Sequence, residues 1–446
     1  MDLTAQAGLT LVVETLLALR TRELVGERLR LRRRRRGFDE YEKLQALVLL
    51  LASGGERVED VRQLRQDVAL QRMLGGTIPS PDGLHDFLAA FHDEEATQAR
   101  PARGAFVPVE SEALRALAAV NTEWVARSVV LHAPTRATLD LDATVIESHK
   151  RDARMHYLGG RGYQPTAVLW AEEDLVVADE YRDGNVPAAH RVCEVAQRAF
   201  GALPPSVTER FFRGDSACYE GRLLKWLCGS DIGFTVSAYM SRELRAVCAS
   251  PSVKWKLLED RADAVCAYAE VEFAAGNWPR RARPLRYVAV RLCGKQGRLF
   301  SDGAETKYLA VATNRDGAAA DLVRWHWEKA GTVEHLHDVT KNELGGRIPP
   351  SGRFGANAAW YRLNLLTYNV LTTLKRHALP QALRHARPRR LRYEVFGVAA
   401  VLREHARQLT AQLGPTPLTV DELVAARGRL LQLHARLGPL LAPSSP

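Results

Sequence analysis

The sequence lacks the long apolar runs and the leader that mark membrane and secreted proteins. None of its apolar runs reaches the roughly 18 residues that a membrane span requires, and stretches such as Leu44–Ala52 are short. The start, Met1-Asp2-Leu3-Thr4, has neither the cationic segment nor the apolar region of a secretory signal. We therefore expect a soluble cytoplasmic protein.

Cysteine is also scarce and irregularly placed. The six cysteines are scattered over 446 residues, and none forms a Cys-x-x-Cys pair. This distribution argues against a disulfide scaffold or a zinc module. Hydrophobic residues make up 46% of the chain and charged residues 26%, as in ordinary globular proteins. The length favours two to three domains, because single hydrophobic cores usually stop growing below this size.

The chain carries a net basic charge. A formal net charge of +10 favours a polyanionic partner, since each phosphate that Lys or Arg neutralises releases condensed counterions. The densest basic segment, Arg28–Arg36, contains seven arginines in nine residues. We expect it to contact DNA, although a basic linker is the alternative. The candidate contacts in this segment are Arg32, Arg33, Arg34, Arg35 and Arg36.

Hydrophobic periodicity divides the chain into a helical and a mixed part. Up to about residue 130, apolar residues such as Leu9, Val13 and Leu16 recur at helical spacing. After Pro134 the period becomes two, which predicts a strand with one polar face. Further patterns predict a hairpin from 166–170 and 175–181, a helix over 187–200 and a strand over 209–214.

The order strand, strand, strand, helix, strand favours an α/β fold with an RNase-H-like mixed sheet. Strand-like runs then predict a β-rich insertion, and an apolar amphipathic helix follows at Ala356–Leu374. The predicted domains are a helical DNA-binding domain with a basic arm (1–130), a catalytic core in two parts (131–232 and 314–378), the insertion (233–313) and a helical C-terminal region (379–446).

Carboxylates at the ends of predicted core elements are the candidates for phosphodiester chemistry. This chemistry needs charge compensation on the attacking and leaving oxygens, which two Mg²⁺ ions about 3.5–4 Å apart provide through oxygen ligands. Asp142 lies on the polar face of the first predicted strand, and Asp140 shares that face, so either could be the ligand. Asp215 follows the strand over 209–214, where it could equally cap a helix.

Glu334 lies inside a predicted helix, with Lys341 seven residues on and therefore on the same face. A salt-bridged surface glutamate is the alternative. His335 and His337 are poor metal co-ligands, because residues two apart on a helix diverge by about 200°. We interpret both histidines as polar neighbours.

Five ordered blocks resemble DDE transposases of bacterial insertion sequences, over about residues 40 to 375. The blocks are Leu139-Asp-Leu-Asp-Ala-Thr-Val-Ile-Glu-Ser-His-Lys150, Arg161-Gly-Tyr-Gln-Pro165, Tyr181-Arg-Asp-Gly-Asn-Val-Pro187, Phe212-Arg-Gly-Asp-Ser-Ala-Cys-Tyr219 and Arg353-Phe-Gly-Ala-Asn-Ala-Ala-Trp360. The resemblance implies a catalytic triad that binds two Mg²⁺ ions, with Mn²⁺ as a possible substitute. Carried over by motif, the triad is Asp142, Asp215 and Glu334.

The resemblance also has a departure. The family's glutamate is accompanied by a Lys seven residues after it, which Lys341 matches, by a Tyr seven before and by an Arg four before. The last two positions are Trp327 and Ala330 here. Three interpretations stay open: strand transfer is weakened, another cation (Arg324 or Lys329) replaces the phosphate-binding arginine, or this is an inactive copy.

The family resemblance implies cut-and-paste transposition of double-stranded DNA. The partners would be the terminal inverted repeats of the element and a target DNA, held by a homodimer, and the protein would be nucleoid-associated. An aromatic residue of the insertion would stack on a flipped base. The candidates are Trp278 and Trp255, with Trp278 ahead because of its basic loop, and the alternative for each is a core residue. The alternatives are an inactive transposase-derived DNA-binding protein and a stand-alone RNase-H-fold nuclease. The remaining candidate DNA contacts are Arg161, Arg213 and Lys341.

Overall fold

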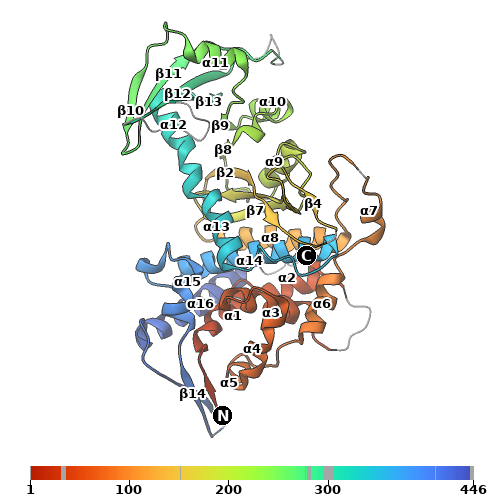
Figure 1. The fold of residues 1–446 in the computed structure, drawn as a ribbon. Coiled ribbons are helices and arrows are strands. Elements are labelled where there is room, and N and C mark those ends of the chain that lie inside the picture. Colours follow the sequence, from red (N-terminus) through yellow and green to blue (C-terminus); the bar gives the residue numbers. More distant parts are fainter. Residues whose placement is uncertain are drawn as a thin grey trace.

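The structure, a computed structural model, describes residues 2–31, 37–101, 103–150, 152–276, 278, 283–295, 305–406 and 408–441. The molecule is elongated, with a β-rich end, a central sheet and a helical end that also holds the N-terminus (Figure 1). The predicted DNA contacts Arg32 to Arg36 lie outside the described residues. Within these ranges, no helix combines the length and apolar character that crossing a membrane requires.

The central sheet confirms the predicted strand order. Its five core strands run β7-β6-β2-β8-β9, with β2, β8 and β9 parallel and β6 antiparallel to both of its neighbours. This is the RNase-H-like arrangement that the sequence predicted. The strands are β2 (Arg136–Ala143), β6 (Thr166–Trp170), β7 (Leu175–Glu180), β8 (Glu209–Gly214) and β9 (Gly233–Ser237).

Alternation along β2 separates the two faces of this sheet. Leu139 and Leu141 belong to a core that also contains the apolar residues of α9 (Val192–Gly201) and α10 (Gly221–Gly229). Asp140 and Asp142 point to the opposite face, as period-two geometry requires. That face is covered by α8 (Glu112–Val129), α13 (Val333–Glu343) and α14 (Phe354–His377).

The predicted insertion extends the core sheet. β13 pairs antiparallel with β9, and β12, β11 and β10 follow outward. Strand β9, at the start of the predicted insertion, is therefore part of the central sheet; the domain boundaries themselves stay predictions. The elements are α11 (Arg242–Ala249), β10 (Lys256–Asp260), β11 (Ala264–Val271), β12 (Arg286–Gly294), β13 (Thr306–Thr313) and α12 (Ala319–Trp327).

The helical end begins with well-capped helices. Asp39 and Glu42 form a reciprocal capping box at the start of α3, and Gly54 caps its end with a φ of 99°, a conformation that glycine adopts easily. Helix α3 packs against α14, and α1 packs against the C-terminal helix α16 (Val420–Leu441). The N-terminal helices are α1 (Thr10–Ala18), α2 (Thr21–Arg28), α3 (Glu40–Ser53), α4 (Val61–Gln66), α5 (Val68–Met73), α6 (Pro81–Ala89) and α7 (Glu94–Gln98).

Two small sheets were not predicted. A hairpin of β14 (Ala400–His405) and β15 (Gln408–Leu413) pairs with β1 (Leu3–Thr4), so the C-terminal region contains strands as well as the expected helix. Much of the hairpin is exposed, and it therefore shows no clear apolar alternation. The other small sheet is β3 (Ile146–Glu147), β5 (Arg161–Tyr163) and β4 (Arg154–Met155). Short helical segments occur at η1 (Ala7–Leu9), η2 (Val58–Asp60), η3 (Ser216–Cys218), η4 (Glu328–Gly331), η5 (Gln381–Leu383), α15 (Pro388–Leu391) and η6 (Arg392–Phe396).

Candidate active site

Strand register brings Asp142 and Asp215 to the same edge of the sheet. In the parallel pair β2–β8, Leu141 lies opposite Gly214, and the two aspartates are the next residues on each strand. Neighbouring strands lie about 4.8 Å apart, so the two side chains start from adjacent positions. The Asp142 side chain is only 17% exposed.

A buried lysine joins Asp142 to the predicted glutamate. Lys329 lies in η4, is 7% exposed, and places its Nζ 3.6 Å from Asp142 Oδ1 and 3.7 Å from Glu334 Oε1. Glu334 is the second residue of α13, the helix that packs across β2 and β6. The three predicted acids and this lysine, named here the carboxylate cluster, therefore lie together.

The charges of the carboxylate cluster do not balance. The pKa of Asp142 is raised to about 6, chiefly by burial and also by the neighbouring Asp215 and Glu334, against the opposing effect of Lys329. Burial lowers the pKa of Lys329, yet the three acids outweigh this effect and leave that pKa raised. Three carboxylates thus share one ammonium, which gives the cluster an excess of negative charge.

Asp215 has the capping role, one of the two that the sequence left open. Its Oδ1 accepts a hydrogen bond of 3.0 Å from the Ala217 backbone N–H, so it caps η3. Its charge also acts on Asp142 and Lys329. The cap fixes the carboxylate at the strand end, where it faces the other acids.

His337 belongs to this site, whereas the sequence indicated only a polar neighbour. It follows Glu334 by three residues, which places both on one face of α13, and its Nε2 lies 3.8 Å from Asp142 Oδ2. Both ring nitrogens are buried and make no hydrogen bond within the described structure. Burial, followed by the nearby Lys341 and Lys329, lowers the pKa of His337 to about 3, so the ring is neutral. The spacing of Glu334 and His337 was the missed signal.

Asp140 has a different environment. It is fully buried, and Arg213 binds it through two hydrogen bonds, Nε to Oδ1 at 2.6 Å and Nη2 to Oδ2 at 2.8 Å. The Thr332 hydroxyl donates to Oδ2 as well. Arg213 is 1% exposed and also donates to the Trp325 carbonyl and to Glu328. These contacts argue against Asp140 as the metal ligand and against the DNA contact predicted for Arg213.

The other predicted DNA contacts are more dispersed. Lys341 is half-buried on α13, and Arg161 is exposed at the start of β5. Trp278 is half-buried, packs against the core, and donates its indole N–H to the Arg283 carbonyl at 3.1 Å. Trp255 lies 6.0 Å from the Tyr308 ring between centroids. Both tryptophans thus have packing partners within the protein.

The positions that depart from the family pattern have separate environments. Trp327 lies beneath the Arg261 guanidinium, 4.5 Å from its ring centroid, and Ala330 is exposed. Arg324 pairs with Asp321 at 3.1 Å. Of the two predicted replacements for the arginine, Lys329 is therefore the one that reaches the carboxylate cluster.

The donor chemistry of the cluster suits a hard cation. Within the part of the chain that the structure describes, no three His, Cys, Asp or Glu side chains are close enough to hold a metal ion together. The Lys329 ammonium supplies the positive charge between Asp142 and Glu334. Oxygen donors with excess negative charge are nevertheless the ligands that Mg²⁺ and Mn²⁺ prefer.

Comparisons with known proteins identify a family. The family described as "Transposase DDE domain group 1" matches residues 1–435. No curated protein matches the chain. A cryo-electron microscopy structure of a piggyBac transposase synaptic complex with hairpin DNA is similar over 99% of this chain and 83% of its own, with 12% sequence identity and a TM-score of 0.44.

Proposed function

The chain belongs to the transposase DDE domain group 1 family, and we propose from this premise that it excises an insertion sequence and joins it to target DNA with divalent metal ions. The main support is the meeting of Asp142, Asp215 and Glu334 around Lys329 at one edge of the sheet. Asp142 lies on β2, Glu334 lies on α13 and Asp215 directly follows β8. These are rigid elements, which positioned chemistry requires.

The three acids would hold the metal ions, and their residue types fit this task. Bound Mg²⁺ or Mn²⁺ would stabilise the charge on the attacking and leaving oxygens of phosphodiester exchange. The neutral His337 keeps Asp142 from forming a permanent ion pair on that side. Lys329 compensates the charge of the acids before DNA binds. Its flexible stem then lets the ammonium turn toward the scissile phosphate, where it replaces the arginine that is absent at Ala330.

Two successive displacements act on the transferred strand, and excision additionally requires that the second strand is cut at each element end. Hydrolysis at the element end breaks one phosphodiester and leaves a 3′-OH, and this hydroxyl then attacks a target phosphodiester and displaces a second 3′-oxygen. The same carboxylate cluster serves both steps, because each is an in-line exchange at phosphorus. Since both element ends must be processed together, we propose a homodimer on DNA.

Two other functions compete with this proposal. A DNA-binding protein that has lost catalysis would retain the fold, and the residues at Trp327 and Ala330 permit it. A stand-alone nuclease would use the same acids without joining DNA. The location of Lys329 between Asp142 and Glu334 favours the active transposase, because it supplies a cation where the family arginine is missing.

A plasmid that carries the coding sequence with its native flanks tests the proposal. The full chain with Mg²⁺ should nick at the element ends and join them to a second DNA. Asp215→Asn, directly after β8, should abolish both steps, whereas Glu209→Gln, exposed at the start of that strand, should leave them unchanged. End binding without any cleavage would support the inactive DNA-binding protein, and cleavage without end preference or joining would support the nuclease.

A further inference from the structure

A basic groove lies at the end of α13 farther from Glu334. It has a volume of about 910 Å³, and α15 and η6 form one of its walls. Four arginines and one glutamate line it, so the lining carries a net positive charge. These are Arg387, Arg389, Arg390, Arg392 and Glu343, with the 76% exposed Tyr393 at the side.

Two of these arginines hold the groove in place. Arg387 donates from Nη2 to Asp338 at 2.6 Å and from Nε to Glu343 at 2.5 Å, both on α13. Arg392 donates to the Glu343 carbonyl and to the Ala52 carbonyl of α3. The groove is therefore fixed to the helix that carries Glu334, and its position relative to the carboxylate cluster is set by that helix.

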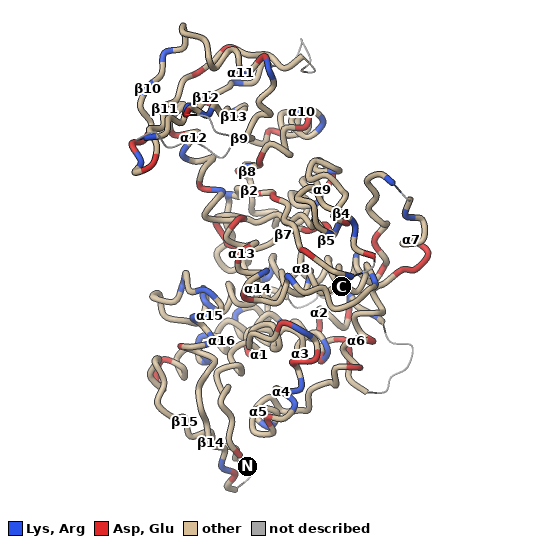
Figure 2. The backbone as a smooth tube through the Cα atoms, in the orientation of Figure 1, with Lys and Arg blue, Asp and Glu red and all other residues tan. Residues whose placement is uncertain are grey.

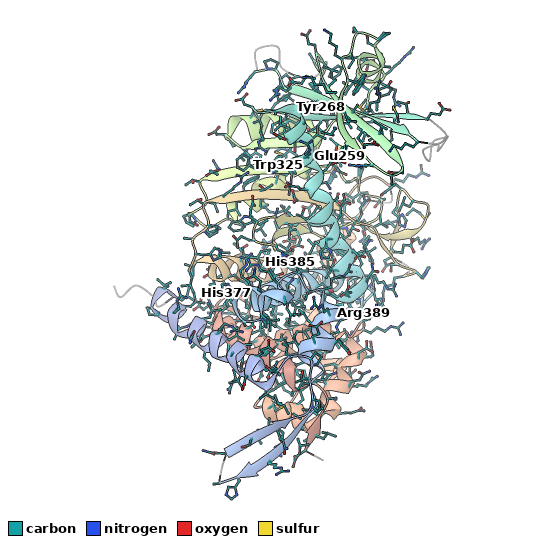
Figure 3. All side chains as sticks on the ribbon, turned by 90° about the vertical axis from the view of Figure 1, so that its left-hand side faces the viewer. Glu259, Tyr268, Trp325, His377, His385 and Arg389 are labelled. Atoms are coloured by element: carbon teal, nitrogen blue, oxygen red, sulfur yellow. The ribbon has the colours of Figure 1, made fainter. Side chains whose placement is uncertain are left out.

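The other two arginines are available to a ligand. Arg389 is exposed, and its guanidinium has no acidic partner within the described residues. Arg390 is also exposed and pairs with Glu394 at 2.6 Å, a surface pair that contributes little to stability. Basic residues gather at α15 (Figure 2), and Arg389 lies beside the lower end of the α13 ribbon (Figure 3).

We propose that this groove binds the phosphate backbone of the DNA whose scissile phosphate lies at the carboxylate cluster. Asn342, on the groove, follows Glu334 by eight residues of one helix, or about 12 Å at 1.5 Å per residue. This corresponds to about three to four base-pair steps of 3.4 Å. The guanidinium forks of Arg389 and Arg390 suit phosphate oxygens. The inference rests on the proposed function, since it takes DNA as the substrate.

Salt-dependent binding of a mixed-sequence DNA duplex to the full chain, without divalent cations, tests this inference. Removing both contacts with Arg389→Gln and Arg390→Gln should reduce the log–log salt slope by about 0.9 for each lost phosphate contact. Arg→Lys changes at these positions should restore most of the slope, because they retain the charge. Glu394→Gln should strengthen binding, since it releases Arg390 from its pair.

Matched controls separate the groove from general charge. Arg245→Gln on α11 and Arg403→Gln on β14 remove exposed arginines at opposite ends of the molecule (Figure 1), and they should leave the slope unchanged. Thermal melting verifies that every variant is folded. A wild-type chain without salt-dependent DNA binding would contradict the proposed function itself. Normal wild-type binding with equal slopes for the groove and control variants would overturn the groove alone.

Discussion

Asp140 and Asp142 lie two residues apart on the same face of β2, yet the structure surrounds them in opposite ways. Asp140 is fully buried and receives two hydrogen bonds from Arg213 and one from Thr332. Asp142 faces two other acids and shares one ammonium with them. A fully paired carboxylate holds elements of the fold together, whereas an underpaired group of acids has capacity for a cation from outside.

The two regions also differ in what they contribute to stability. Arg213 connects β8 to β2 and to the segment that carries Lys329, so its ion pair supports the fold around the site. The carboxylate cluster keeps like charges close, which disfavours the folded state without a cation. Substitutions in the Asp140–Arg213 pair should therefore act mainly on stability, and substitutions in the carboxylate cluster mainly on catalysis.

The largest expected effect is on catalysis by the carboxylate cluster. Asp142→Asn should lower the rate of Mg²⁺-dependent DNA cleavage by about 1,000-fold or more, since stabilisation by the metal is worth several kcal/mol. DNA binding should change little, because the loss concerns the transition state. The measurement is single-turnover cleavage beside a binding titration. Cleavage at near wild-type rate would remove Asp142 from the site.

Next in size is the effect of breaking the pair on Asp140. Asp140→Ala leaves the Arg213 guanidinium buried without its main partner, which should cost about 3–5 kcal/mol of unfolding free energy. Urea denaturation measures it, and the double variant with Arg213→Met should recover part of the loss. A loss below about 1 kcal/mol, the value of an exposed pair, would contradict the structural role.

The third effect is a gain of stability with a defined pH dependence. The Asp142 pKa of about 6 lies above its ordinary 3.8, so its contribution to stability is complete below pH 3.8 and is lost as pH rises through about 6. Asp142→Asn has no such loss. In metal-free buffer at pH 7.5 its free energy of unfolding should exceed that of the wild type by up to about 3 kcal/mol. Denaturation at pH 4 and pH 7.5 compares the two. A difference that does not grow with pH would contradict this account.

The smallest effect concerns the lysine of the cluster. Lys329→Met should lower the unfolding free energy by about 1–2 kcal/mol at neutral pH, because Asp142 can take up a proton and Glu334 is exposed to water. Added Mg²⁺ should raise the melting temperature of this variant more than that of the wild type. Equal shifts would mean that Lys329 does not compensate the acids that hold the metal.

Much of the fold could be predicted because it depends on local periodicity. The alternation over 137–143 and the hairpin over 166–181 are confirmed as β2 and the β6–β7 pair. The choice between Asp140 and Asp142 could not be made from alternation, since both share one face. It depends on the register that places Arg213 opposite Asp140, which is a contact between distant segments.

The sequence indicated the places of two site residues, Lys329 and His337, only weakly. Lys329 precedes Glu334 by five residues, and the 3-10 turn of η4 brings it into the cluster. His337 could have been found from its three-residue spacing to Glu334. In the fold, the β14–β15 hairpin could not be predicted from the sequence, because its largely exposed strands have little apolar pattern.

Mn²⁺ binding by the full chain at neutral pH tests most directly whether the underpaired acids form the metal centre. Calorimetric titration should detect binding by the wild type, a large loss of affinity in Asp142→Asn and Glu334→Gln, and wild-type affinity in folded Asp140→Asn. Equal losses in Asp140→Asn and Asp142→Asn, or no binding by the wild type, would contradict the assignment of the two regions.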